Sequence, residues 1–136
     1  MAIEYRDNPD LGNEALNALW ATAWNTPHPR DFQPILSRNL AHVGAFAGTR
    51  LVGFVNVAWD GGIHAFILDT CVDPEFRRRG IASALVERAK TLANERGAEW
   101  LHVDFEPHLS GFYRGLGFAP TEAGLIRLRD QQAISH

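Results

Sequence analysis

The chain has 136 residues, of which 46% are hydrophobic and 21% charged, and this is typical of one folded domain with a buried core. Its formal net charge of −3 argues against a surface built to bind nucleic acid. A single cysteine excludes an intrachain disulfide, and no apolar run approaches the roughly 20 residues that a membrane-spanning helix needs. The N-terminus is too polar for a signal peptide, so we expect one cytoplasmic domain, residues 1–136, without a membrane partner.

The first half of the chain predicts a strand, two helices and three further strands. Alternation of apolar and polar residues indicates a strand at 3–7, and apolar residues with helix spacing follow within 8–24. Asp31 is a candidate cap for a second helix that ends at Asn39. Residues 42–62 predict a hairpin with a turn at 48–50, and 63–72 predict a third apolar strand.

The second half changes to helix spacing at Gly80. A buried stripe is expected at Ile81, Ala84, Leu85, Ala89, Leu92 and Ala93. Gly97 is expected to terminate this helix, and a strand at 99–105 follows it. A short helix within 109–118 and a last strand at 124–129 complete the order β-α-α-β-β-β-α-β-α-β. This order predicts an α/β (α+β) chain with a mixed sheet and helices on both faces.

Three arginines lie where the third strand leads into the long helix, in the stretch "DTCVDPEFRRRGIASALVERA". A strand, a short loop and a helix N-terminus gather unpaired backbone N–H groups around an anion. Gly80 removes a side chain where the backbone must approach a ligand, and Ala82 keeps the next turn small. The spacing of a P-loop and that of a dinucleotide fingerprint are both absent. These residues alone fit either a pyrophosphate pocket or an ordinary charged loop.

A wider match favours the pyrophosphate pocket. The segment "VDPEFRRRGIASALVERA" resembles the acetyl-CoA-binding motif of the GNAT acetyltransferase superfamily, and the matching residues are Val72, Pro74, Arg77, Gly80 and Ala82. Downstream, "FYRGLGF" resembles the F-Y-x-x-x-G-F helix of the same family. The resemblance covers nearly the whole chain and implies a GNAT fold with a mixed central sheet of about six or seven strands. Glu106 and Leu109 stand where the family often has asparagine and alanine.

The resemblance also implies how the donor, acetyl-CoA, is bound as a co-substrate without a metal ion. The strand backbone would pair with the pantetheine arm at a break in the sheet, usually a bulge, and the helix start would hold the pyrophosphate. The residues that carry over to this role are Thr70, Cys71, Val72, Arg77, Arg78, Arg79, Gly80, Ile81, Ala82 and Ser83. A backbone N–H near Val72 would stabilise the oxyanion of a direct transfer.

Tyr113 carries over from the family as the general acid that protonates the departing thiolate. The alternative is that Tyr113 is a core residue on an apolar helix. The base that accepts the proton of the amine is open: the candidates are Asp69, Glu106, Asp104, His102, His108, His64 and water. Cys71 is either a covalent relay or a small buried apolar residue, and no neighbouring base favours the relay.

The sequence does not decide which molecule accepts the acetyl group: a small-molecule amine, an amino acid and a protein amine all remain open. Trp24 is a candidate for the wall of its pocket, and Arg30 is either a partner for a carboxylate or phosphate of the acceptor or a solvated loop residue. One rival reading is a domain of the same fold that binds acyl-CoA without transfer, and another is a transferase for a different acyl group. A nucleic-acid-binding module built on the three arginines is disfavoured by the net charge. The strand at 124–129 could pair across a homodimer.

Overall fold

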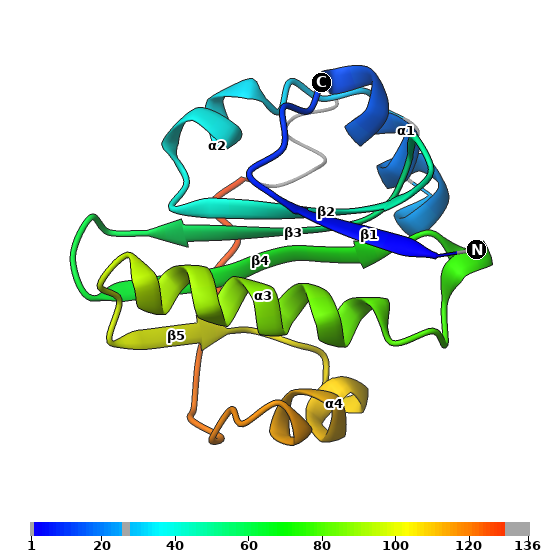
Figure 1. Ribbon diagram of the computed structural model, residues 1–136. Helices are drawn as coiled ribbons and strands as arrows, with labels where there is room; N and C mark the ends of the chain where they lie inside the picture. Colours follow the sequence, from blue (N-terminus) through cyan, green and yellow to red (C-terminus); the bar gives the residue numbers. More distant parts are fainter. Residues whose placement is uncertain (1, 26–27, 130–136) are drawn as a thin grey trace. The chain divides into compact units, whose positions relative to one another are not determined.

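The computed structural model describes residues 2–25 and 28–129, and Figure 1 shows their helices and strands. By their contacts they form two compact units, one up to Phe105 and one from Glu106 on, and each is described by itself. No helix of these residues is long and apolar enough to span a membrane. The elements are β1 (Ile3–Asp7), α1 (Asn13–Trp24), α2 (Gln33–Arg38), β2 (Ala41–Ala47), β3 (Arg50–Trp59), β4 (His64–Val72), α3 (Ile81–Glu95), β5 (Trp100–Val103) and α4 (Ser110–Gly115).

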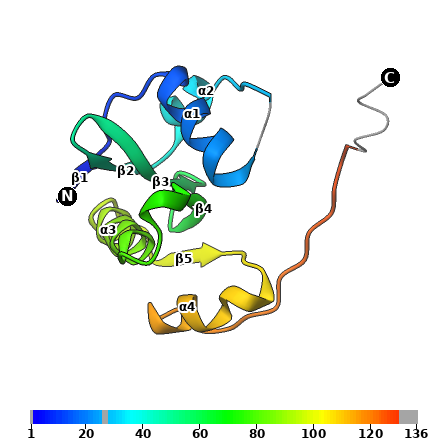
Figure 2. The same cartoon turned by 90° about the vertical axis from the view of Figure 1, so that its right-hand side faces the viewer.

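The first unit is built on a mixed sheet in the order β1-β2-β3-β4-β5. Neighbouring strands are antiparallel except for β4 and β5, which are parallel and are connected through α3. Helices lie on both faces, as the sequence predicted, and Figure 2 shows α1 and α2 on one face and α3 on the other. Adjacent residues of β3 explain this arrangement: the Phe54 ring lies 5.7 Å from the Trp20 ring of α1, whereas a Cβ on Gly53 would lie 3.1 Å from Leu85 of α3.

The predicted strand count was too high. Five strands are formed within the described residues, rather than six or seven, and 124–129 is not a strand. Leu125, Ile126 and Leu128 are 88%, 83% and 89% exposed. Apolar alternation produces a strand only where a neighbouring strand accepts its hydrogen bonds, and this segment is paired with none of the described strands.

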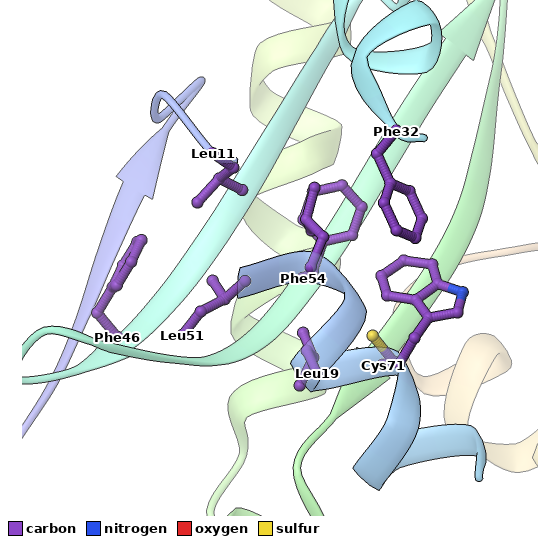
Figure 3. Packing of buried hydrophobic residues seen from close by; sticks show 9 residues of the cluster. Leu11, Leu19, Phe32, Phe46, Leu51, Phe54 and Cys71 are labelled. Carbon is purple, nitrogen blue, oxygen red and sulfur yellow. The ribbon is translucent and has the colours of Figure 1, made fainter. Parts of the chain in front are cut away.

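The cluster between α1 and the sheet is formed by Leu11, Leu16, Leu19, Trp20, Phe32, Phe46, Leu51, Phe54 and Cys71. Figure 3 shows the Cys71 sulfur among these apolar side chains. On the opposite face, α3 buries the predicted stripe, with Val86 fully buried and Ala84 only partly. The helix ends as predicted at Gly97, whose φ is 95°, with the Ala98 N–H donating to the Ala93 carbonyl at 3.0 Å.

Candidate functional site

A bulge interrupts β4 at Asp69 and Thr70. Opposite β3, Cys71 pairs with Phe54 and Leu68 with Asn56, so two residues of β4 face one of β3. Asp69 has a φ of 59°, in the left-handed region. On the other side of β4, the pairing with β5 ends at Ile67, so the rest of β4 has no strand partner there among the described residues. The break that the family resemblance implied therefore lies at residues 69–70, two residues before Val72.

The backbone of Val72 points to this open edge. The N–H of the next residue, Asp73, donates to the Val52 carbonyl of β3 at 2.8 Å. Successive N–H groups of an extended chain point to opposite sides, so the Val72 N–H faces away from β3. It is a hydrogen-bond donor at the place where the resemblance implies an oxyanion contact.

The turn after β4 is held by Asp73, which the sequence reasoning missed as a functional residue. Its carboxylate accepts a hydrogen bond from the Glu75 N–H at 2.9 Å and caps the short 3-10 turn at 74–76. Its other oxygen receives the Arg50 guanidinium at 2.6 Å, while Arg50 also reaches Glu75 at 3.4 Å. An aspartate before a proline is a helix-start signal, but the partner Arg50 is 23 residues away and left no local trace.

We expect Asp73→Asn to loosen this turn. The carboxylate is 4% exposed and holds both a backbone N–H and a guanidinium, so losing its charge should lower the free energy of unfolding by about 1–3 kcal/mol. Thermal unfolding measures this. Glu75→Gln is the matched control, because Glu75 forms an ion pair with the same arginine, Arg50, but its side chain is 74% exposed. This exposed pair is expected to contribute less than about 1 kcal/mol to the free energy of unfolding. Equal effects of the two variants would contradict the assignment.

The chain then forms an anion-binding turn. Arg78 and Gly80 have φ values of 64° and 75°, and left-handed residues of this kind turn consecutive N–H groups toward one point. The first hydrogen bond of α3 runs from the Ala84 N–H to the Gly80 carbonyl at 3.1 Å. The N–H groups of Ile81, Ala82 and Ser83 therefore have no partner inside the helix, and the positive end of the 15-residue helix dipole adds to their field.

The three arginines have different environments. Arg77 donates from Nη2 to the Ala23 carbonyl at 3.2 Å, which ties the turn to the end of α1. The Arg79 guanidinium lies 5.0 Å above the Phe76 ring. All three residues are exposed at the turn, so Arg78 and Arg79 contribute positive charge at its rim, while Arg77 also fixes its position.

Asp69 is the candidate base that lies in the bulge of β4 itself. Burial raises the pKa of its carboxyl above the usual value, and the Arg30 guanidinium lowers it in part. Burial, together with the Asp69 charge, raises the pKa of the Cys71 thiol far above its usual range. Cys71 is therefore a protonated apolar core residue, and its environment argues against a thiolate relay.

Thr70 carries an unusual feature for a buried side chain. Its hydroxyl oxygen is shielded from solvent and has no hydrogen-bond partner within the described part of the chain. A buried polar group without a partner is costly, and such groups are rare in folded proteins. Because Thr70 belongs to the bulge at the open edge of β4, its hydroxyl marks this edge as a place where a polar ligand would be accommodated.

The second unit contains Glu106 and Tyr113. Tyr113 is buried at 6% exposure, and its ring meets the Phe112 and Phe118 rings at 4.9 and 5.7 Å. The Phe118 N–H donates to the Tyr113 carbonyl at 3.1 Å, and Gly117 has a φ of 99°. This C-terminal cap explains why the chain has glycine and phenylalanine after the short helix. Glu106 is exposed at the start of the turn before α4.

The other candidate bases divide into two groups. His64 and His102 are partners of each other, with 2.9 Å between Nδ1 of the first and Nε2 of the second. Asp104 and His108 are exposed.

The residues expected to bind the donor lie in the first unit, on the continuous stretch from the bulge of β4 to the start of α3. They are Asp69, Thr70, Cys71, Val72, Arg77, Arg78, Arg79, Gly80, Ile81, Ala82 and Ser83.

Comparison with known proteins agrees with this geometry. The model of the Acetyltransferase (GNAT) family matches residues 12–118. Serotonin N-acetyltransferase 2, chloroplastic, of Oryza sativa subsp. japonica is 32% identical over 96% of this chain and 70% of its own length. Six further curated relatives are aligned over less than half of their own length.

Solved structures share the fold. A GNAT family acetyltransferase of Streptococcus pneumoniae TIGR4 has a TM-score of 0.78 at 24% identity, over 94% of this chain and all of the other. An aminoglycoside N-acetyltransferase in complex with a CoA bisubstrate analogue has a TM-score of 0.74 at 22% identity, over 96% and 99%. The fold, the β4–α3 turn and the family match agree, and the chain belongs to the GNAT family of acetyltransferases.

Proposed function

We propose that this protein transfers the acetyl group of acetyl-CoA directly to a primary amine. The observation that carries the proposal is the bulge at Asp69 and Thr70, followed without a break by the anion-binding turn. One end of this stretch offers an open strand edge for an amide-containing arm, and the other offers helix-start N–H groups for a pyrophosphate. The two ligand types occur together in CoA.

The residues that are present fit this donor. The N–H groups from Arg78 to Ser83 would hold the pyrophosphate, and the backbone of Thr70–Val72 would pair with the pantetheine amides. The partnerless Thr70 hydroxyl supports a polar ligand at the same edge. The structural relative with a CoA bisubstrate analogue supports this donor by analogy of fold.

The proposed reaction is a direct transfer through a tetrahedral intermediate. Asp69 takes a proton from the acceptor ammonium, and the neutral amine attacks the thioester carbon. The carbonyl electrons move to oxygen, where the Val72 N–H stabilises the oxyanion. Collapse breaks the carbon–sulfur bond, and Tyr113 gives its proton to the thiolate. The attacking nitrogen loses its second proton to the resulting tyrosinate, directly or through water, so that a neutral amide and the CoA thiol leave. Positioning of the two reactants supplies the larger share of the rate increase.

Thr70→Val tests the donor site on its own. Valine has nearly the same shape and removes a hydroxyl that has no partner, so the free protein should become slightly more stable. The same variant should weaken acetyl-CoA binding about fivefold, the equivalent of one lost hydrogen bond. Calorimetric titration and thermal unfolding measure the two effects. Thr91→Val is the control, because the Thr91 hydroxyl donates to the Glu87 carbonyl on the exposed side of α3. Unchanged acetyl-CoA affinity in Thr70→Val would refute the contact.

The activity itself is tested by thiol release from acetyl-CoA with a set of primary amines, followed by mass identification of the amide. We expect amine-dependent thiol release and an N-acetyl product. Binding of acetyl-CoA without release for any amine would favour the acyl-CoA-binding domain. Faster release from propionyl- or succinyl-CoA would favour a different acyl group.

A further inference from the structure

Two asparagines of α1 hold the segment that lies directly before α2. The Asn17 side chain forms two hydrogen bonds with the backbone of Arg30: its nitrogen donates to the Arg30 carbonyl at 2.9 Å, and its oxygen accepts from the Arg30 N–H at 2.8 Å. One turn earlier on the helix, the Asn13 side chain accepts from the Phe32 N–H at 2.9 Å. The backbone at 30–32 therefore has a fixed place along α1.

The Arg30 side chain lies on the buried cluster. Its guanidinium is 5.7 Å from the centre of the Phe32 ring, and the Phe32 ring is 4.7 Å from the Trp20 ring. Phe32, Trp20 and Cys71 belong to one cluster, in which Figure 3 shows Phe32 and the Cys71 sulfur. Cys71 comes two residues after Asp69, so these contacts lead from Arg30 to the part of β4 that contains the bulge.

Arg30 and Asp69 interact without touching. Burial raises the pKa of the Asp69 carboxyl, and the Arg30 guanidinium lowers it by a smaller amount. The two groups form no ion pair in the part of the chain that the structure describes. The neighbouring Asp31 has other partners, because its carboxylate accepts from the Asn13 side chain at 3.0 Å and from the Gln33 N–H at 3.1 Å. Arg30 and Asp69 therefore offer separate places for two opposite charges.

A guanidinium and a carboxylate arranged in this way match a zwitterion. The planar guanidinium of Arg30 can bind a carboxylate through two parallel hydrogen bonds, and Asp69 can bind an ammonium. A phosphate dianion would bring a second negative charge near Asp69, and a polyamine would bring a positive charge near Arg30. These charges therefore favour an acceptor with one ammonium and one carboxylate.

We propose that the acceptor is a free amino acid whose ammonium lies at Asp69 and whose carboxylate lies at Arg30, which Asn17 positions. This inference rests on the proposed function and names the substrate class of the same site. It uses only α1, the segment before α2 and β4, all of which belong to the first unit.

The test measures kcat/KM by thiol release from acetyl-CoA for three amino acids and their amides. Glycine, β-alanine and 4-aminobutanoate cover three separations of amine and carboxylate, and each amide has nearly the same shape without the negative charge. In the wild type we expect at least one acid to exceed its amide about tenfold or more, because hydrogen bonds between charged groups are the strongest ones. Arg30→Gln should lower this acid-to-amide ratio about tenfold, mainly through the KM of the acid. A change in the pKa of Asp69 affects both substrates, so the ratio reports the contact with the carboxylate.

Asn17→Leu tests the positioning of Arg30. Leucine has a similar size but removes both hydrogen bonds to the Arg30 backbone, so the acid-to-amide ratio should fall severalfold. In the Arg30→Gln background the same change should leave the ratio as it is in Arg30→Gln alone, because the guanidinium that Asn17 positions is gone. Equal effects of Asn17→Leu in the two backgrounds would contradict the positioning role.

Arg38→Gln is the matched control. It removes the same charge from an exposed arginine in the last turn of α2, and its ratio should equal that of the wild type. Amides that react as well as the acids at all three separations would overturn the proposal. An unchanged ratio in Arg30→Gln would overturn it too, even with a shifted pH–rate profile, because Arg30 would then act on Asp69 alone.

Failure of this inference is distinguishable from failure of the proposed function. Spermidine and phosphoethanolamine are assayed beside the amino acids. A preference for either of them over all three amino acids would overturn the acceptor class and leave the acetyl transfer in place. If no amine causes thiol release, the proposed function fails and this inference fails with it.

Discussion

Tyr113→Phe is expected to lower kcat about 100-fold or more while the Kd for acetyl-CoA stays within about twofold. The reason is that phenylalanine retains the ring but removes the only proton that the side chain can give to a leaving thiolate. The Tyr113 ring is buried against Phe112 and Phe118, so the packing of α4 should survive the change. Single-turnover kinetics and calorimetric titration measure the two quantities separately.

The chain offers a clean control for this variant. It has two tyrosines, and Tyr5 lies in β1, outside the candidate site. Tyr5→Phe removes the same hydroxyl and should leave both quantities at the wild-type level. If Tyr113→Phe turned over as fast as Tyr5→Phe, Tyr113 would be a core residue and the acid would have to be another group or water.

Asp69→Asn is expected to lower kcat/KM at neutral pH about 100-fold and to remove the acidic limb of the pH–rate profile. A general base acts only when it has lost its proton, so the wild-type rate should rise with pH through the pKa of Asp69. Burial raises that pKa, so the limb should lie above the usual value of an aspartate, which is near 4. Asparagine keeps the shape and tolerates the left-handed backbone of this position.

The same variant should gain stability at neutral pH. The folded state holds the proton of Asp69 more tightly than the unfolded chain does, so this group favours folding less as pH rises through its raised pKa. Below the ordinary pKa of aspartate, Asp69→Asn and the wild type should therefore unfold at similar temperatures. As the pH rises through the shifted pKa, the variant should become the more stable protein. Thermal unfolding between pH 3 and 8 measures the pH at which the two melting temperatures separate.

Glu106→Gln decides between the two carboxylates proposed as bases. Glu106 is exposed, and its replacement should leave the melting temperature and the acidic limb unchanged. If the limb disappears in Glu106→Gln and persists in Asp69→Asn, Glu106 is the base. If it persists in both variants, the proton leaves through water or a histidine.

Much of the backbone of the candidate donor site could be predicted because its signals are local. The sequence places glycine at position 80, where it was expected for close approach of a ligand, and the structure shows that this residue also has a left-handed backbone, with a φ of 75°. The ends of α3 and α4 follow from Gly97 and Gly117 in the same way. The apolar stripe predicted every buried residue of α3 except Val86, and it included Ala84, which is only partly buried. The two positions are two residues apart on a helix, where successive residues are 100° apart, so a stripe defines the edges of the buried face poorly.

The remaining features depend on contacts between distant residues. The pair of Asp73 and Arg50 joins the turn to the start of β3, and no local pattern predicts it. The bulge sets the environment of Asp69, although alternation alone left the direction of this side chain open. The strand expected at 124–129 failed for a related reason, because a strand is defined by the partner that pairs with it.

The most direct test of the whole account is a calorimetric titration of the purified protein with acetyl-CoA, with ATP as the control. We expect one molecule of acetyl-CoA to bind at micromolar strength, binding to be weaker in Arg78→Ala and Arg79→Ala, and ATP to bind weakly or not at all. No binding of acetyl-CoA by the folded protein would contradict the donor assignment, and the roles proposed for Asp69, Thr70 and Tyr113 would fall with it.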